Sequence, residues 1–185
     1  MNNILMTSSL FQLLDEQVSL CFTGRINILK KDNNQIMGFI ILLNGKVVNS
    51  RYFNKVGIKG FNHIILDDFF TKEFTYVVEP EIIGEENILI SLPYSKLVEN
   101  LKVLFTKTKE SLQLKPPESI QFYIDCEFIE KGPHINASEY EILCLLSDYS
   151  HMKDILLNKN MLDYELYNSL ITLRKKGALK VIDNK

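Results

Sequence analysis

The sequence predicts an α+β fold, in which an antiparallel sheet with packed helices is followed by a compact helical unit. Residues 25–53 hold three apolar segments separated by turn residues, and the second turn is Asn44-Gly45. Asn-Gly is the strongest short hairpin pattern, because both central residues of a type I′ turn need positive φ. Residues 138–182 instead carry apolar side chains at helical spacing and end in a glycine and a short strand.

Composition sets the class of protein. The chain has 185 residues, 46% of them hydrophobic, and a formal net charge of -2, which allows two small domains. We place these domains at residues 1–117 and 118–185. No apolar run approaches the ~18–20 residues that span a membrane, and the first residues lack the basic region of a signal peptide. These two observations predict no membrane insertion. The three cysteines are widely spaced, without metal-ligand spacing, and we therefore expect a cytoplasmic protein.

The elements of the first domain follow from local patterns. A helix capped by Ser8 or Ser9 carries one apolar face, formed by Leu10, Leu13, Leu14, Val18 and Cys21. The further elements are strands at 25–31, 35–43 and 46–53, a helix at 57–69, a strand at 72–79 and a helix from 93 to about 109. The second of these strands is apolar on both faces, so we expect it to be central. Gly57 and Gly60 favour close packing of their helix on the sheet over a phosphate cradle, because no phosphate-binding motif accompanies them.

The second domain begins with a strand at 120–129, in which Asp125 and Glu127 would share one exposed face. Ser138 and Glu141 then fit an S-x-x-E capping box for the first of three helices. Asp163 is expected to cap the third helix, and Gly177 to end it. Three helices, a glycine and a strand are the order of a winged-helix module, which binds either DNA or another protein.

The charges of this module favour a protein partner over DNA. Asp163 and Glu165 lie at the start of the third helix, where a DNA reader meets base edges. Residues 138–185 hold seven positive side chains: Lys153, Lys159, Arg174, Lys175, Lys176, Lys180 and Lys185. They hold as many negative ones: Glu139, Glu141, Asp148, Asp154, Asp163, Glu165 and Asp183. The basic excess that drives binding to DNA is missing. A DNA-binding transcription regulator stays as the alternative because of the run that starts at Arg174.

Six segments carry a resemblance to a known family: TGRINI (23–28), GFIILLNGKVVNS (38–50), GIKGFNHIILDDF (57–69), EFTY (73–76), KLVENLKVL (96–104) and LITLRKKG (170–177). They resemble the PATAN family, a bacterial signalling domain of unknown function named from the N-terminus of PatA response regulators. The chain departs from it at Ser50 and Asn62, where alanine is common, and it has no tryptophan. The resemblance implies a non-enzymatic signalling protein whose partner is a response regulator, a small GTPase or a motility component.

Two groups of residues are candidate partner-binding sites, because tyrosine and arginine are common interface anchors. Tyr164 and Tyr167 should lie off the leucine stripe of the third helix, with Arg174 near its end. The second group is formed by Arg51, Tyr52 and Phe53 at the end of the meander. The alternative is that these tyrosines cover the rim of the core. Pairing of a hairpin edge with a second copy, giving a homodimer, is left open.

No constellation of residues predicts an enzyme, a cofactor or a metal. The three histidines are far apart in the chain: His63, His134 and His151. His63 is expected to be partly exposed on its helix. The adjacent pair Asp67-Asp68 is expected on solvated surface, because neighbours on a helix point in different directions.

Overall fold

The structure is a computed structural model that describes residues 8–183. The chain divides into two compact units, Met1–Phe105 and Thr106–Lys185, which we call the sheet unit and the helical unit. The division falls inside helix α3 (Tyr94–Ser111), ahead of the 3₁₀ helix η3 (Leu112–Leu114) and of the predicted domain boundary after residue 117. The predicted α+β class is confirmed. None of the helices in residues 8–183 is both long and apolar enough to cross a bilayer.

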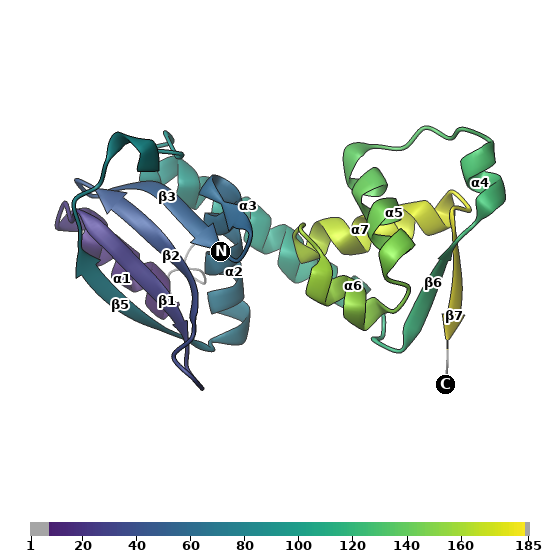
Figure 1. Cartoon of the computed structure of the whole chain (residues 1–185), viewed down its shortest axis with the longest axis horizontal. Coiled ribbons are helices and arrows are strands. Elements are labelled where there is room, and N and C mark those ends of the chain that lie inside the picture. The colour runs from purple at the N-terminus through teal and green to yellow at the C-terminus, as the bar shows by residue number, and fades with distance from the viewer. Residues whose placement is uncertain (1–7, 184–185) are drawn as a thin grey trace. The chain divides into compact units, whose positions relative to one another are not determined.

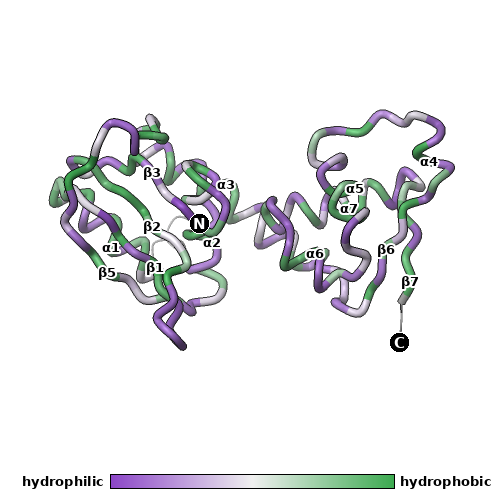
Figure 2. The backbone as a smooth tube through the Cα atoms, in the orientation of Figure 1, coloured by the Kyte–Doolittle hydropathy of each residue, from purple (hydrophilic) through white to green (hydrophobic). Residues whose placement is uncertain are grey.

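The sheet unit contains one five-stranded antiparallel sheet. Its strands are β1 (Gly24–Lys30), β2 (Ile36–Leu43), β3 (Lys46–Tyr52), β4 (Lys55–Val56) and β5 (Phe74–Pro80). Their order is β4-β3-β2-β1-β5, so β2 is central, as its apolar sequence predicts (Figures 1 and 2). The β2–β3 turn has the positive φ angles of the predicted hairpin, 50° at Asn44 and 72° at Gly45.

Helices cover one face of this sheet. Figure 1 shows α1 (Ser9–Ser19) and α2 (Gly57–Thr71) behind the strands, with the opposite face toward the viewer. Ser8 caps α1, since its side chain accepts a hydrogen bond from the Phe11 backbone N–H. Cys21 lies beyond the end of α1 and is exposed, so its predicted place on the apolar face of the helix is wrong.

Helix α2 packs closely on β3. A Cβ atom on Gly60 would lie 2.8 Å from the carbonyl oxygen of Lys55 and 2.9 Å from Ser50 Oγ. The prediction that a glycine permits close packing here is therefore confirmed. The buried face of α2 is wider than its apolar stripe, because the helix also packs on α3 through the Phe69 and Phe105 rings, whose centroids are 4.6 Å apart.

This wide burial corrects two expectations about polar residues of α2. His63 is buried rather than partly exposed. Asp68 is 2% exposed, and one of its carboxylate oxygens accepts a hydrogen bond from the Tyr76 hydroxyl. A buried carboxylate needs such a donor, and β5 supplies it through Tyr76.

The helical unit combines four helices with two strands. They are β6 (Ile120–Ile124), α4 (Cys126–Glu130), α5 (Ala137–Asp148), α6 (Met152–Asn158), α7 (Asp163–Lys175) and β7 (Leu179–Asp183). The core is built from the apolar faces of α5, α6 and α7, with Leu166, Leu170 and Leu173 all buried as predicted. Gly177 has φ 80°, the left-handed conformation expected after α7.

The ends of three elements differ from the prediction. The strand predicted at 120–129 stops at Ile124, and Asp125 caps α4, so Asp125 and Glu127 do not share a strand face. Helix α5 begins earlier than expected: its capping box joins Asn136 and Glu139, not Ser138 and Glu141. Asp163 is the first residue of α7 rather than its cap.

The sheet of the helical unit is assembled differently from a winged-helix hairpin. Strand β7 pairs antiparallel with β6, which precedes the three helices, and Phe122 lies opposite Val181. The predicted succession of three helices, a glycine and a strand is present.

Candidate protein-interaction surfaces

The three candidate residues at the end of β3 differ in exposure, although the Tyr52 and Phe53 rings pack edge to face with centroids 4.7 Å apart. Arg51 and Phe53 are exposed, and the Arg51 guanidinium donates a hydrogen bond from Nε to the Phe53 carbonyl oxygen at 3.2 Å. Tyr52 is 6% exposed and its ring packs against Phe74. Side chains alternate along a strand, so Tyr52 points to the helix-covered face, and its expected exposure is wrong. Burial, followed by the neighbouring Asp67, raises the pKa of the Tyr52 hydroxyl.

Near Arg51, three exposed aliphatic residues are grouped at Gly57: Val56 and Ile58 are its chain neighbours, and Leu89 approaches it from a distant segment. Val56, Ile58 and Leu89 are 54%, 37% and 56% exposed, and we call them the aliphatic cluster. Leu89 Cβ lies 3.8 Å from the place that a Cβ on Gly57 would take. The Leu89 backbone N–H donates to the Val48 carbonyl oxygen at 2.8 Å, which holds this segment against β3.

Charged side chains of both signs flank the aliphatic cluster. Arg51 lies opposite Val56 in the β3–β4 pair, and Lys59 is in the first turn of α2. Glu85 and Glu86 belong to the 3₁₀ helix η2 (Glu85–Asn87), just before Leu89. All four side chains are exposed. Among the described residues, none of the four forms an ion pair.

The candidate residues on α7 are only partly available for contact. Tyr167 is 1% exposed within the core, so its expected place off the apolar stripe is wrong. Tyr164 is half-buried, and Lys107 Nζ lies 5.5 Å from the centre of its ring. Burial and the neighbouring Glu165 raise the pKa of Tyr164 to about 12. Arg174 is exposed, as expected.

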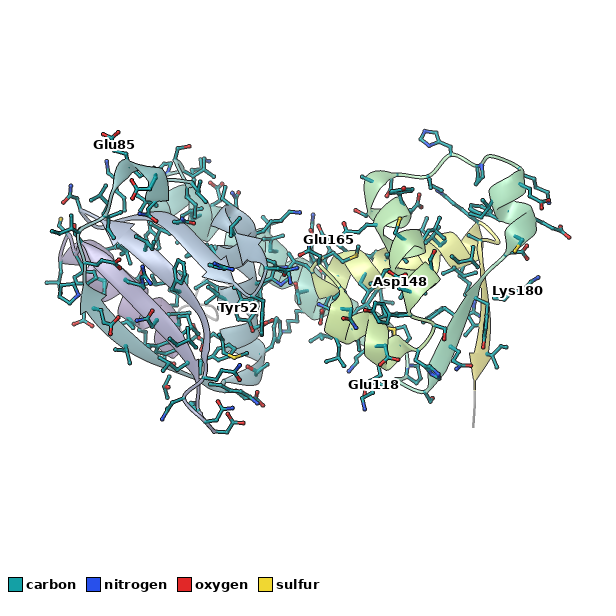
Figure 3. All side chains as sticks on the ribbon, in the orientation of Figure 1. Tyr52, Glu85, Glu118, Asp148, Glu165 and Lys180 are labelled. Atoms are coloured by element: carbon teal, nitrogen blue, oxygen red, sulfur yellow. The ribbon has the colours of Figure 1, made fainter. Side chains whose placement is uncertain are left out.

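Several lysines of the helical unit form ion pairs with acidic residues of the same unit. Lys176 Nζ lies 2.8 Å from Glu139 Oε1, and Lys180 Nζ lies 2.8 Å from Asp125 Oδ2 (Figure 3 labels Lys180). Lys159 Nζ is 2.5 Å from Asp163 Oδ1 at the start of α7. Lys153, Arg174 and Lys175 have no ion-pair partner among the described residues, and Lys185 lies outside them. Half of the six described cations in residues 138–183 are therefore paired within the unit.

Glu139 is the central residue of this arrangement. It is 1% exposed, and its carboxylate accepts hydrogen bonds from the Asn136 backbone N–H at 2.8 Å and from Lys176 Nζ at 2.8 Å. Lys176 also donates to the His134 carbonyl oxygen at 3.1 Å. The Lys176 ammonium, together with the Asn136 N–H, holds the pKa of the Glu139 carboxyl below its ordinary value. Glu139 thus joins the start of α5 to the end of α7.

Two other kinds of site could hold a ligand: a metal-ligand cluster and a cavity for a small molecule. No group of three or more His, Cys, Asp or Glu residues in 8–183 could hold a metal ion. A cavity of about 240 Å³ lies at the β1–β2 turn, lined by Lys30, Lys31, Asp32, Lys72 and Glu73. Two of its three lysines are engaged: Lys30 pairs with Asp32 at 2.9 Å, and Lys31 donates to the Lys72 carbonyl oxygen at 2.5 Å. We assign this cavity no ligand.

Comparison with family models, curated proteins and solved structures finds no significant match for this chain. The resemblance to the PATAN family therefore stays a prediction. The interaction surfaces above rest on the geometry alone.

Proposed function

We propose that the chain is a non-enzymatic protein-interaction module of cytoplasmic signalling. The observation that carries the proposal is the use of charge in the helical unit. Lys159, Lys176 and Lys180 are held by carboxylates of the same unit, and Asp163 and Glu165 occupy the start of α7. These ion pairs reduce the number of cations that can bind phosphates, whereas a mixed surface with exposed apolar groups is typical of protein contacts.

Exposed apolar side chains on the helical unit support the same proposal. Tyr140 on α5 is 62% exposed and Leu157 on α6 is 74% exposed. Together with Arg174 they include two of the residue types that most often anchor interfaces. The PATAN resemblance suggests the partner's class: a response regulator, a small GTPase or a motility component.

A DNA-binding regulator is the second candidate, because Arg174 and Lys175 at the end of α7 form no ion pair within residues 8–183. A mobility-shift assay with genomic fragments at low salt separates the two functions. We expect no shift. A shift that weakens steeply with salt and is lost in Arg174→Glu would favour DNA binding, because neutralised phosphates make affinity salt-dependent.

The positive test is crosslinking inside the cell. A photoreactive amino acid replaces Tyr140, Leu157 or Arg174, one at a time, and the same substitution at the exposed Glu130 of α4 serves as the control. We expect one partner protein to be trapped from the α5–α7 positions and not from the control. If every position traps only this protein or nothing, while the variants are folded, the proposal is wrong.

A further inference from the structure

We propose that the aliphatic cluster and its charged flanks form a twofold interface with a second copy of this chain. The inference goes beyond the proposed function, because it concerns the sheet unit and needs no other protein. It begins from Val56, Ile58 and Leu89, which are large, apolar and exposed and lie at or beside Gly57. Clustered exposed apolar groups rimmed by polar residues are typical of interaction sites.

The charges around the cluster are arranged in order along β3. Leu89 is hydrogen-bonded at Val48, so the segment that carries Glu85 and Glu86 lies toward that end of the strand. Arg51 lies three residues further along β3, roughly 10 Å away at the rise of a strand. Figure 3 shows the labelled Glu85 and Tyr52 far apart in the sheet unit, with Glu85 pointing outward. An acidic flank and a basic flank thus lie on either side of an apolar centre.

A surface of this order is complementary to itself. In a twofold interface the same patch is used by both copies, and it meets its partner turned around. The apolar centre then faces its own copy, and Glu85 and Glu86 of one chain face Arg51 and Lys59 of the other. A partner of a single charge would be attracted by one flank and repelled by the other, so a second copy fits better than a purely basic or purely acidic segment.

The lack of internal ion pairs for these four charges, within the described residues, supports the assignment. Arg25 of β1 pairs with Glu81, at 2.9 Å, within the same unit. Arg51, Lys59, Glu85 and Glu86 have no ion-pair partner among the described residues, although the unit carries both signs. Opposite charges placed across an interface set its register and suppress other arrangements.

The test is a charge exchange, followed by sedimentation over a range of protein concentrations. The wild-type chain should form dimers that dissociate on dilution. Glu85→Lys with Glu86→Lys, and Arg51→Glu with Lys59→Glu, should each weaken the dimer at least about tenfold, because like charges then face each other. An equimolar mixture of the two variants should restore a dimer. Leu89→Asp should weaken the dimer and should not be rescued in a mixture with either charge variant.

The control variant carries Glu110→Lys and Glu130→Lys on exposed residues of the helical unit. It changes the net charge by the same amount as Glu85→Lys with Glu86→Lys. It should dimerise like the wild-type chain. Circular dichroism establishes that every variant is folded. A wild-type chain that stays monomeric at about millimolar concentration, a mixture that fails to recover, or a control that weakens the dimer equally would each overturn the inference. None of these outcomes would bear on the crosslinking test of a different partner.

Discussion

The sheet unit and the helical unit are held together by different means. In the sheet unit, α2 is fixed on β3 by close backbone approach at Gly60, beside a central strand that is buried at Ile40, Ile41 and Leu42. In the helical unit, Glu139 and Lys176 join the first and last helices of the three-helix core by charge. The comparison separates two uses of charged side chains. In the helical unit, the charged side chains of the Glu139–Lys176 pair hold the fold together and are not available to a ligand. In the sheet unit, the charged side chains around the aliphatic cluster are available.

The largest expected effect breaks the charged junction. Glu139→Ala removes the partner of Lys176 and half of the capping box, and we expect the helical unit to lose about 3 kcal/mol of unfolding free energy. Urea denaturation followed by far-UV circular dichroism measures it. Glu141→Ala, on the exposed side of the same helix, is the control and should change stability by less than about 0.5 kcal/mol. Equal losses in both variants would mean that helix propensity, not the junction, is responsible.

The same junction makes the helical unit sensitive to acid. The pKa of Glu139 is lower in the folded chain than its ordinary value of 4.5. The stability it contributes is therefore complete above pH 4.5 and is lost as the pH falls through the folded-state pKa. Denaturation series from pH 7 to pH 3 should show this loss, and Glu139→Gln should flatten it. An unchanged slope in Glu139→Gln would assign the acid sensitivity to other carboxylates.

A steric change should act on the sheet unit instead. Gly60→Ala places a methyl group 2.8 Å from the Lys55 carbonyl oxygen, and we expect a loss of about 2 kcal/mol as α2 moves from β3. Gly132→Ala cannot serve as the control, because Gly132 has positive φ. The comparison variant is instead Ala137→Gly in α5, which changes the helical unit. Nuclear magnetic resonance shifts should change in the sheet unit for Gly60→Ala. Shifts confined to the helical unit would contradict the comparison.

A smaller effect is expected from removing only the hydroxyl of the buried tyrosine of α7. The Tyr167 hydroxyl lies 3.5 Å from Asp163 Oδ2, a long hydrogen bond, so Tyr167→Phe should cost only about 0.5 kcal/mol. Tyr167→Ala should cost about 3 kcal/mol, since it empties a fully buried site. Thermal unfolding of both variants checks the difference. A large loss in Tyr167→Phe would show that the hydroxyl, rather than the ring, holds α7.

The smallest expected effect concerns the unpaired charges. Reversing Glu85 and Glu86 to lysine should change unfolding free energy by less than about 0.5 kcal/mol, because both side chains are exposed and make no ion pair in the described chain. Measurement at a dilution where any dimer has dissociated isolates the monomer. A loss above about 1 kcal/mol would place these carboxylates among the structural charges and remove the contrast between the two units.

The sequence predicts what is local and fails where burial depends on distant elements. The hairpin at Asn44-Gly45 and the glycine after α7 follow from backbone chemistry at single positions, and both are found. Tyr52 and Tyr167 were expected at the surface, and each is covered by segments far along the chain. Tyrosine is compatible with either place, because its ring is apolar and its hydroxyl is polar.

The same limit applies to the surfaces. The junction of Glu139 with Lys176 joins residues 37 positions apart, and no periodic pattern connects them. The capping box was predicted two residues too late. Asn136 and Glu139 have the same spacing as Ser138 and Glu141, so spacing alone does not choose between the two pairs. The aliphatic cluster needed the contact between Leu89 and Gly57, which only the folded chain brings together.

The pairing of β6 with β7 has a mechanical consequence. Ile120, the first residue of β6, lies opposite Asp183, the last residue of β7, so both residues are at the same end of the five-residue ladder. A tension applied between these two points would open the ladder like a zipper, one residue pair at a time, instead of loading all its bonds together. The three-helix core would then be pulled only after its strands had parted, which makes the β6–β7 ladder the first element expected to yield under force.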